Sequence, residues 1–144
     1  MFAYSAASLD AIHANRQPLL AALAALNITE VSIRYEGGGD SGDVMEVMVK
    51  PEEQMSQLTT TQMLYHSVLA ENSEGHYQYK LSESSISLDD ALRDFTLTWV
   101  NAHHGGWEND EGGDGTVTLY VPANHCQLAH SECYTERNDY AYSL

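Results

Sequence analysis

Basic residues are scarce in this 144-residue chain, which has six lysines and arginines against 21 aspartates and glutamates. The formal net charge at pH 7 is −15, and no lysine or arginine lies between Arg93 and Arg137. Nucleic acids and anionic membranes are bound by cationic surfaces, so this composition argues against direct binding of either one. It favours attraction to basic protein surfaces and to divalent cations.

Other shortages exclude further classes of protein. The two cysteines, Cys126 and Cys133, are too few for a disulfide framework. No apolar run approaches the roughly 18 residues of a membrane-spanning helix, and the first residues lack the basic and apolar regions of a signal peptide. The hydrophobic fraction of 43% is sufficient for a folded core. We therefore expect a cytoplasmic protein in which residues 1–144 form one domain.

Two segments have apolar residues at helical spacing. Residues 8–27 keep one apolar face, and Pro18 is expected to kink this helix or to restart it near Gln17. Residues 87–104 begin with Ser87 as an N-cap, and two glycines follow their end. The stripe predicted to be buried on this second helix consists of Leu88, Leu92, Phe95, Trp99 and Ala102.

Strand patterns follow each helix. Residues 28–35 and 43–50 predict a hairpin, with a wide glycine loop between the strands rather than a two-residue turn. Residues 116–121 alternate as a strand, and residues 125–137 are expected to return beside it. The order predicts an α+β fold: an antiparallel sheet built from hairpins, with two main helices packed on it.

The segment 51–86 has a less regular pattern. It contains one candidate helix at Thr61–Ala70 and one candidate strand, "HYQYKL", at residues 76–81. The serine-rich stretch at residues 82–87 is typical of a loop.

The stretch "GGWENDEGGDG" at residues 105–115 concentrates the negative charge, with five glycines, four carboxylates and one tryptophan. A shorter acidic glycine loop, "YEGGGDSGD" at residues 35–43, follows the first helix in the same way and also leads into a strand. This internal echo predicts that the two acidic loops lie at the same end of the sheet.

At these two loops the chain resembles an uncharacterised family of small acidic proteins found in bacteria, plasmids and phages. The resemblance is strongest at Glu36–Gly42 and Gly105–Gly115, and it extends from the first hairpin to the tail. It implies a compact α+β fold and a mobile-element setting, and it implies no activity. The chain departs from that family in its ending, "NDYAYSL", and in carrying "HCQLAHSEC".

Three groups of residues are candidates for chemistry. Oxygen ligands from the acidic loops could bind Ca²⁺ or Mg²⁺, although their spacing does not fit an EF-hand; this set is Glu36, Asp40, Asp110 and Asp114. A zinc site is a second alternative, formed by His125, Cys126, His130 and Cys133. The pair His103 and His104 could supply a general base. Solvated turns, free thiols and surface histidines explain the same residues without a site, so our interpretation includes no metal, no cofactor and no catalytic residue.

We interpret the acidity as a surface for a protein partner. A surface that neutralises phosphates is also complementary to ordered carboxylates, which favours a non-enzymatic inhibitor that occupies a basic, nucleic-acid-binding protein, such as an anti-CRISPR or another anti-defence protein. The expected contact residues are Glu36, Asp40, Asp43, Trp107, Glu108, Asp110, Glu111 and Asp114. The main alternative is a divalent-metal-dependent enzyme acting on phosphoester bonds through the same loops. An accessory subunit of a larger complex is a third.

Overall fold

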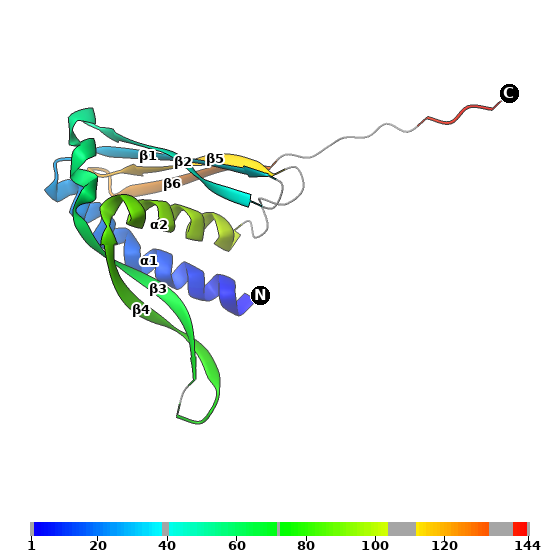
Figure 1. Ribbon diagram of the computed structural model, residues 1–144, viewed down its shortest axis with the longest axis horizontal. Coiled ribbons are helices and arrows are strands. Elements are labelled where there is room, and N and C mark those ends of the chain that lie inside the picture. The colour runs from blue at the N-terminus through cyan, green and yellow to red at the C-terminus, as the bar shows by residue number, and fades with distance from the viewer. Residues whose placement is uncertain (1, 39–40, 72, 104–111, 133–139, 144) are drawn as a thin grey trace.

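The computed structural model describes residues 2–38, 41–71, 73–103, 112–132 and 140–143, and it contains two long helices and six strands in this part of the chain (Figure 1). The elements in chain order are α1 (Phe2–Ala25), β1 (Glu30–Gly38), β2 (Ser41–Lys50), a 3-10 helix η1 (Glu52–Thr59), β3 (Thr61–Glu71), β4 (Tyr77–Ser87), α2 (Leu88–His103), β5 (Gly113–Tyr120) and β6 (His125–Glu132). The predicted α+β class is confirmed.

Four antiparallel strands form the main sheet in the order β2-β1-β5-β6. Helices α1 and α2 lie side by side over one face of this sheet, and in the described part of the chain no element covers the opposite face (Figure 1). Alternation along the strands sends apolar side chains toward the helices and polar ones outward. The core consists of Val31, Ile33, Tyr35, Val117 and Leu119 from the sheet together with Leu19, Leu23, Leu92 and Phe95 from the helices.

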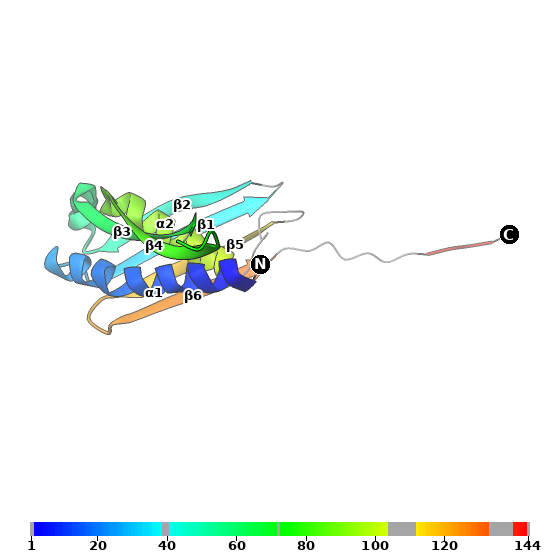
Figure 2. The ribbon, with the colours of Figure 1, turned by 90° about the horizontal axis from the view of Figure 1, so that it is seen from below.

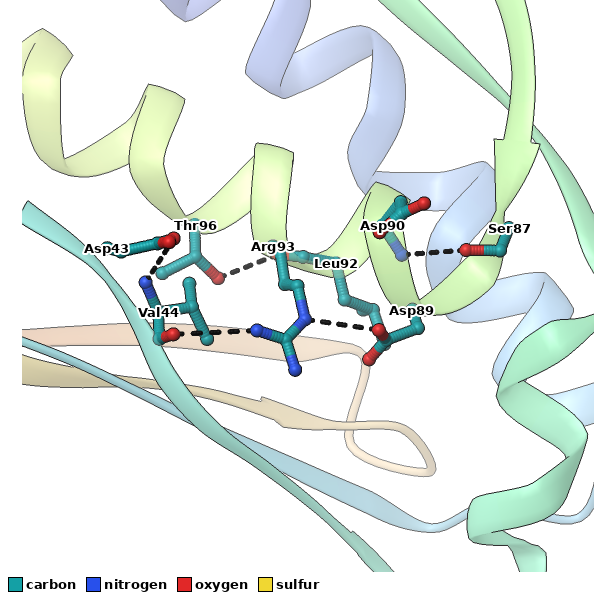
Figure 3. Close-up of polar contacts among 8 residues, drawn as sticks. All are labelled: Asp43, Val44, Ser87, Asp89, Asp90, Leu92, Arg93 and Thr96. Carbon is teal, nitrogen blue, oxygen red and sulfur yellow. Dashed lines mark hydrogen bonds and ion pairs between the residues drawn. The ribbon is translucent and has the colours of Figure 1, made fainter.

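Helix α2 forms as the sequence predicts. The Ser87 hydroxyl accepts a hydrogen bond from the Asp90 backbone N–H at 3.1 Å, which caps the helix (Figure 3). Leu88, Leu92 and Phe95 are buried, with at most 1% of their surface exposed. Phe95 also packs against Trp99 with ring centroids 5.8 Å apart.

Helix α1 continues through Pro18, so of the two alternatives expected there the restart near Gln17 is wrong. Proline removes one backbone hydrogen bond, but Leu19, Leu20 and Leu23 are almost fully buried directly after it and hold the second half of the helix in place. The helix ends as predicted before Asn27, which has the left-handed φ of 60° common at helix ends. No helix in the described residues is long and apolar enough to cross a membrane.

The β1–β2 hairpin is tighter than predicted. The wide glycine loop is wrong, because Gly37 pairs with Gly42 and Gly38 pairs with Ser41, so only two residues separate the strands. The register shifts between Arg34 and Tyr35, which marks a β-bulge four paired positions before the end of the ladder.

The segment 51–86 also differs from the prediction. The helix expected at Thr61–Ala70 is strand β3, and the strand expected at residues 76–81 is β4, which continues through the serine-rich stretch expected to be a loop. Together they form a separate two-stranded hairpin that projects away from the helices (Figure 1). The buried Asn15 side chain on α1 holds its base: Nδ2 donates to the Tyr65 carbonyl at 2.9 Å, and Oδ1 accepts from the Tyr65 N–H at 2.7 Å.

Candidate functional site

Three of the predicted contact residues come together on adjacent strands. Glu36 on β1 lies opposite Asp43 on β2 and also opposite Asp114 on β5, so the register forms a row across three strands. All three residues are exposed. Glu36, Asp43 and Asp114 form the carboxylate row. The other five predicted contact residues, Asp40, Trp107, Glu108, Asp110 and Glu111, lie outside the residues that the structure describes.

The carboxylate row lies at the end of the sheet where both acidic segments enter. Gly37 on β1 pairs with Gly42 on one side and with Gly113 on the other, so the strand ends that flank residues 39–40 and 104–111 are neighbours. The prediction that the two acidic loops join the same end of the sheet is therefore confirmed for the described residues that flank them.

Arg34 lies on β1 beside the row. Arg34 Nη1 is 3.1 Å from Glu36 Oε2, and Arg34 Nε is 3.7 Å from Glu46 Oε2. These side chains are about half exposed, and exposed ion pairs stabilise a protein by only about 0–1 kcal/mol. Arg34 thus pairs with two of four neighbouring carboxylates, Glu36 and Glu46 but not Asp43 and Asp114, and this patch keeps a negative charge.

Buried Tyr35 supports the row from the inner side of the sheet. Its hydroxyl is 2.6 Å from His130 Nδ1 on β6, and the two rings are stacked with centroids 5.8 Å apart. Burial raises the pKa of Tyr35 to about 12, and the negative charge of Asp114 adds to the effect. Tyr35 therefore stays neutral and spans the sheet from β1 to β6 beneath Glu36 and Asp114.

Gly115 makes room for that tyrosine. A Cβ atom at this position would lie 2.3 Å from the Tyr35 hydroxyl oxygen, 2.7 Å from its Cζ and 2.3 Å from the Ala129 carbonyl oxygen. No side chain fits there, so the glycine next to Asp114 lets Tyr35 reach His130. The sequence does not predict this arrangement, because its one signal is a glycine inside an alternating strand.

Helix α2 fixes the edge strand that carries Asp43. Figure 3 shows Arg93 between the two elements, with Nε donating to Asp89 Oδ2 at 3.1 Å and Nη1 donating to the Val44 carbonyl at 3.4 Å. Asp43 Oδ1 accepts a hydrogen bond from the Val44 N–H at 2.7 Å, which orients its carboxylate (Figure 3). The Thr96 hydroxyl donates to the Leu92 carbonyl within the helix at 2.8 Å. The end of the row is thereby attached to the packed helix layer.

The candidate zinc ligands do not converge among the described residues. His125 stacks on Tyr120 with ring centroids 5.9 Å apart, His130 contacts Tyr35, and Cys126 is a half-buried free thiol. Cys133 and His104 lie outside the described residues. Within the described ranges, no three His, Cys, Asp or Glu side chains are arranged to hold a metal ion.

Comparison with known proteins identifies a family for the chain but no function. No curated protein and no solved structure matches the chain. One family model does match, over residues 11–144, and its description is "Family of unknown function". The match covers nearly the whole chain, from the middle of α1 to the last residue. The protein therefore belongs to the family DUF6878, whose function is unknown.

Proposed function

We propose that this protein is a non-enzymatic binding protein that places its carboxylate row on a basic, nucleic-acid-binding surface of another protein. The observation that carries the proposal is the row itself, in which Asp43, Glu36 and Asp114 occupy directly paired positions on three strands. The acidic residues of segments 39–40 and 104–111 extend the same negative surface in this proposal.

The carboxylate row destabilises the sheet without improving its packing. Like charges at directly opposite positions of a sheet are destabilising, by about 0.2–1 kcal/mol for each pair. Burial of Tyr35 and Val44 on the inner face does not require acidic residues at the outer positions, where threonine would serve. A basic partner would relieve the repulsion, so we attribute the row to binding and not to stability.

The geometry of the row suits a surface that binds phosphates. Neighbouring strands are about 4.8 Å apart, so three carboxylates span about 10 Å in a straight line. A single nucleic-acid strand places one phosphate charge about every 3.4 Å along its axis, and a phosphate-binding surface holds cations at comparable density. Carboxylates on strands approach such cations with their positions already fixed, which reduces the entropy lost on binding.

The specific form that we propose is an inhibitor of a host defence system encoded by a mobile element, such as an anti-CRISPR protein. The acidity of the chain and its resemblance to small acidic proteins of plasmids and phages support this form. Its target would be an enzyme or complex with a basic nucleic-acid channel.

The proposal is tested by capture of partners from host lysate at low salt. Immobilised protein should retain a basic protein that duplex or single-stranded DNA then elutes, because the row and the nucleic acid compete for one surface. The test variant replaces the row with amides, as Glu36→Gln, Asp43→Asn and Asp114→Asn. The matched control makes the same change in net charge at other exposed positions, as Glu52→Gln, Glu53→Gln and Glu83→Gln.

Binding kinetics then separate a local site from a general effect of net charge. We expect the row variant to associate at least about tenfold more slowly, with a smaller change in dissociation, because exposed charges act mainly by steering. The control variant should keep the association rate within about twofold. Equal losses in both variants would refute a site at the row. A melting temperature that rises with Mg²⁺ or Mn²⁺ and falls back in the row variant would instead favour the metal-dependent phosphoesterase.

A further inference from the structure

A groove between the two helices and β6 lies apart from the carboxylate row. Its volume is about 430 Å³, which lies in the range of 300–1,000 Å³ typical of small-molecule sites. Residues of α1, α2 and β6 line the groove, and Figure 2 shows α1 and β6 on the same side of the molecule. The side chains that matter for its chemistry are Ile12, His13, Arg16, Phe95, Trp99 and Cys126.

The walls of the groove are apolar and partly aromatic. Ile12 and Phe95 are buried with 6% and 1% of their surface exposed, and Trp99 packs on Phe95 at an angle of 58°. Cys126 adds a neutral wall, because burial raises the pKa of its thiol and keeps it protonated, although the neighbouring Arg16 acts in the opposite direction. Such walls suit the flat, apolar body of an aromatic ligand.

The charged residue of the groove is Arg16. Its guanidinium donates to the backbone carbonyl of Asn124 and, at 3.4 Å, to Asn124 Oδ1, which are both neutral oxygens. Arg34, Lys50 and Arg93 each pair with a carboxylate, whereas Arg16, like Lys80 on the β3–β4 hairpin, forms no salt bridge within the described ranges. A guanidinium has five N–H donors, so Arg16 retains donors for an anion after its contacts with Asn124.

Among the described residues, no negative charge lines the groove, although the chain is strongly acidic. Of the described residues that line the groove, none is Asp or Glu, while one is arginine and two, His13 and His103, are histidines. Although the chain has a net charge of −15, this groove has apolar walls and a cationic side chain at one end. Arginine binds carboxylates through two parallel hydrogen bonds, which gives it preference for that group.

We propose that this groove binds a small aromatic carboxylate, with the carboxylate on Arg16 and the ring against Trp99, which Phe95 supports from the core. The site is independent of the carboxylate row, so either proposal can fail without the other.

The test compares two probes of the same shape. Isothermal titration calorimetry measures binding of 2-naphthoate and of its neutral isostere 2-naphthamide to the full chain. We expect one molecule of naphthoate to bind and naphthamide to bind at least about tenfold more weakly, because the amide cannot form the charged pair with Arg16. Equal affinity of the two probes, or no binding of naphthoate at millimolar concentration, would overturn the proposal.

Two variants locate the site. Arg16→Gln keeps an amide donor for the Asn124 carbonyl but removes the charge, and it should lose at least about tenfold in naphthoate affinity with little change for naphthamide. Arg34→Gln removes the same positive charge at a position beside the carboxylate row, outside the groove. This variant should bind naphthoate as the natural chain does. If Arg34→Gln lost as much affinity as Arg16→Gln, the effect would come from net charge and the proposal would be wrong.

Chemical labelling gives a second readout that does not depend on affinity. Peptide mapping after treatment with N-ethylmaleimide follows alkylation of Cys126 separately from Cys133. Bound naphthoate should slow alkylation of Cys126 several-fold in the natural chain and should have no effect in Arg16→Gln. Naphthoate that binds without protecting Cys126 would place the probe elsewhere and refute this site.

Discussion

Replacement of Gly115 by alanine should strongly destabilise the protein, although the new side chain is a single methyl group. The added Cβ would lie 2.3 Å from the Ala129 carbonyl oxygen and 2.3 Å from the Tyr35 hydroxyl oxygen. Ala129 belongs to β6, which is paired with β5 at this position, so its carbonyl cannot retreat without shifting the strand. Tyr35 is fully buried and has little room to turn away.

The size of the effect follows from two contributions. Overpacking of a well-packed interior by one methyl group costs about 1–3 kcal/mol. Displacement of Tyr35 would also break its 2.6 Å hydrogen bond to His130, and a bond of this kind contributes about 1 kcal/mol net. The expected loss in the free energy of unfolding is therefore about 2–4 kcal/mol. For a chain of about 150 residues, this corresponds to a fall in melting temperature of roughly 4–16 °C.

Urea unfolding followed by circular dichroism measures the loss directly. The control is Thr116→Ala, one residue along the same strand on the outward face, where the change should cost less than about 1 kcal/mol. In the background of Tyr35→Phe, the penalty of Gly115→Ala should shrink, because one of the three close contacts disappears. A loss below 1 kcal/mol for Gly115→Ala alone would refute the reasoning, since it would mean that β5 and β6 adjust freely around Tyr35.

Two further predictions concern Tyr35 and Asn15. The neutral phenol of Tyr35 is favoured in the folded state, where its pKa is about 12 against 10 in the unfolded chain, so its contribution to stability is present below pH 10 and lost as the pH rises to 12. Urea unfolding from pH 9 to 12 should therefore show a steeper loss of stability in the natural chain than in Tyr35→Phe, by about 2–3 kcal/mol, and parallel curves would contradict this. Asn15→Leu should cost about 1–3 kcal/mol, because the Tyr65 N–H and carbonyl lose their partner. Hydrogen exchange should then accelerate in β3 while α2 keeps its protection, and unchanged exchange at Tyr65 would show that the amide does not hold the hairpin.

The elements that were predictable from sequence are those that bury one face. Helix α2 has its stripe of Leu88, Leu92 and Phe95 at helical spacing, and β5 alternates between buried Val117 and Leu119 and outward threonines. Both elements pack on a single core, so the spacing of their apolar residues indicates which is a helix and which is a strand. The helix length around Pro18 was not predictable in this way, because burial of the leucines that follow it decides whether the helix continues.

Strand β3 and the serine-rich second half of β4 escaped prediction for the opposite reason, whereas the first half of β4 was predicted as a strand. The first seven residues of β4 are all exposed. This part of the strand therefore has no alternation between buried and exposed positions that the sequence could reveal. Tyr77, Tyr79 and Leu81 are exposed apolar residues that a periodicity argument assigns to a core. Strand β3 has Leu64 as its fully buried apolar residue, and it is held at Tyr65 by a side chain 50 positions away. Long-range contacts of this kind leave no local signal.

The carboxylate row was predictable from the sequence only in part. The acidic residues were identifiable from composition, and the shared end of the sheet was predictable from the echo between the two loops. The direct pairing of Glu36 with both Asp43 and Asp114 was not predictable, because it depends on register, and a shift by one residue would send these side chains to the opposite face. Burial of Tyr35 against the space left by Gly115 favours the observed register of β1 and β5. The residues that define the negative surface are therefore not only the acids: a neutral tyrosine and a glycine on the inner face determine where the charges lie on the outer one.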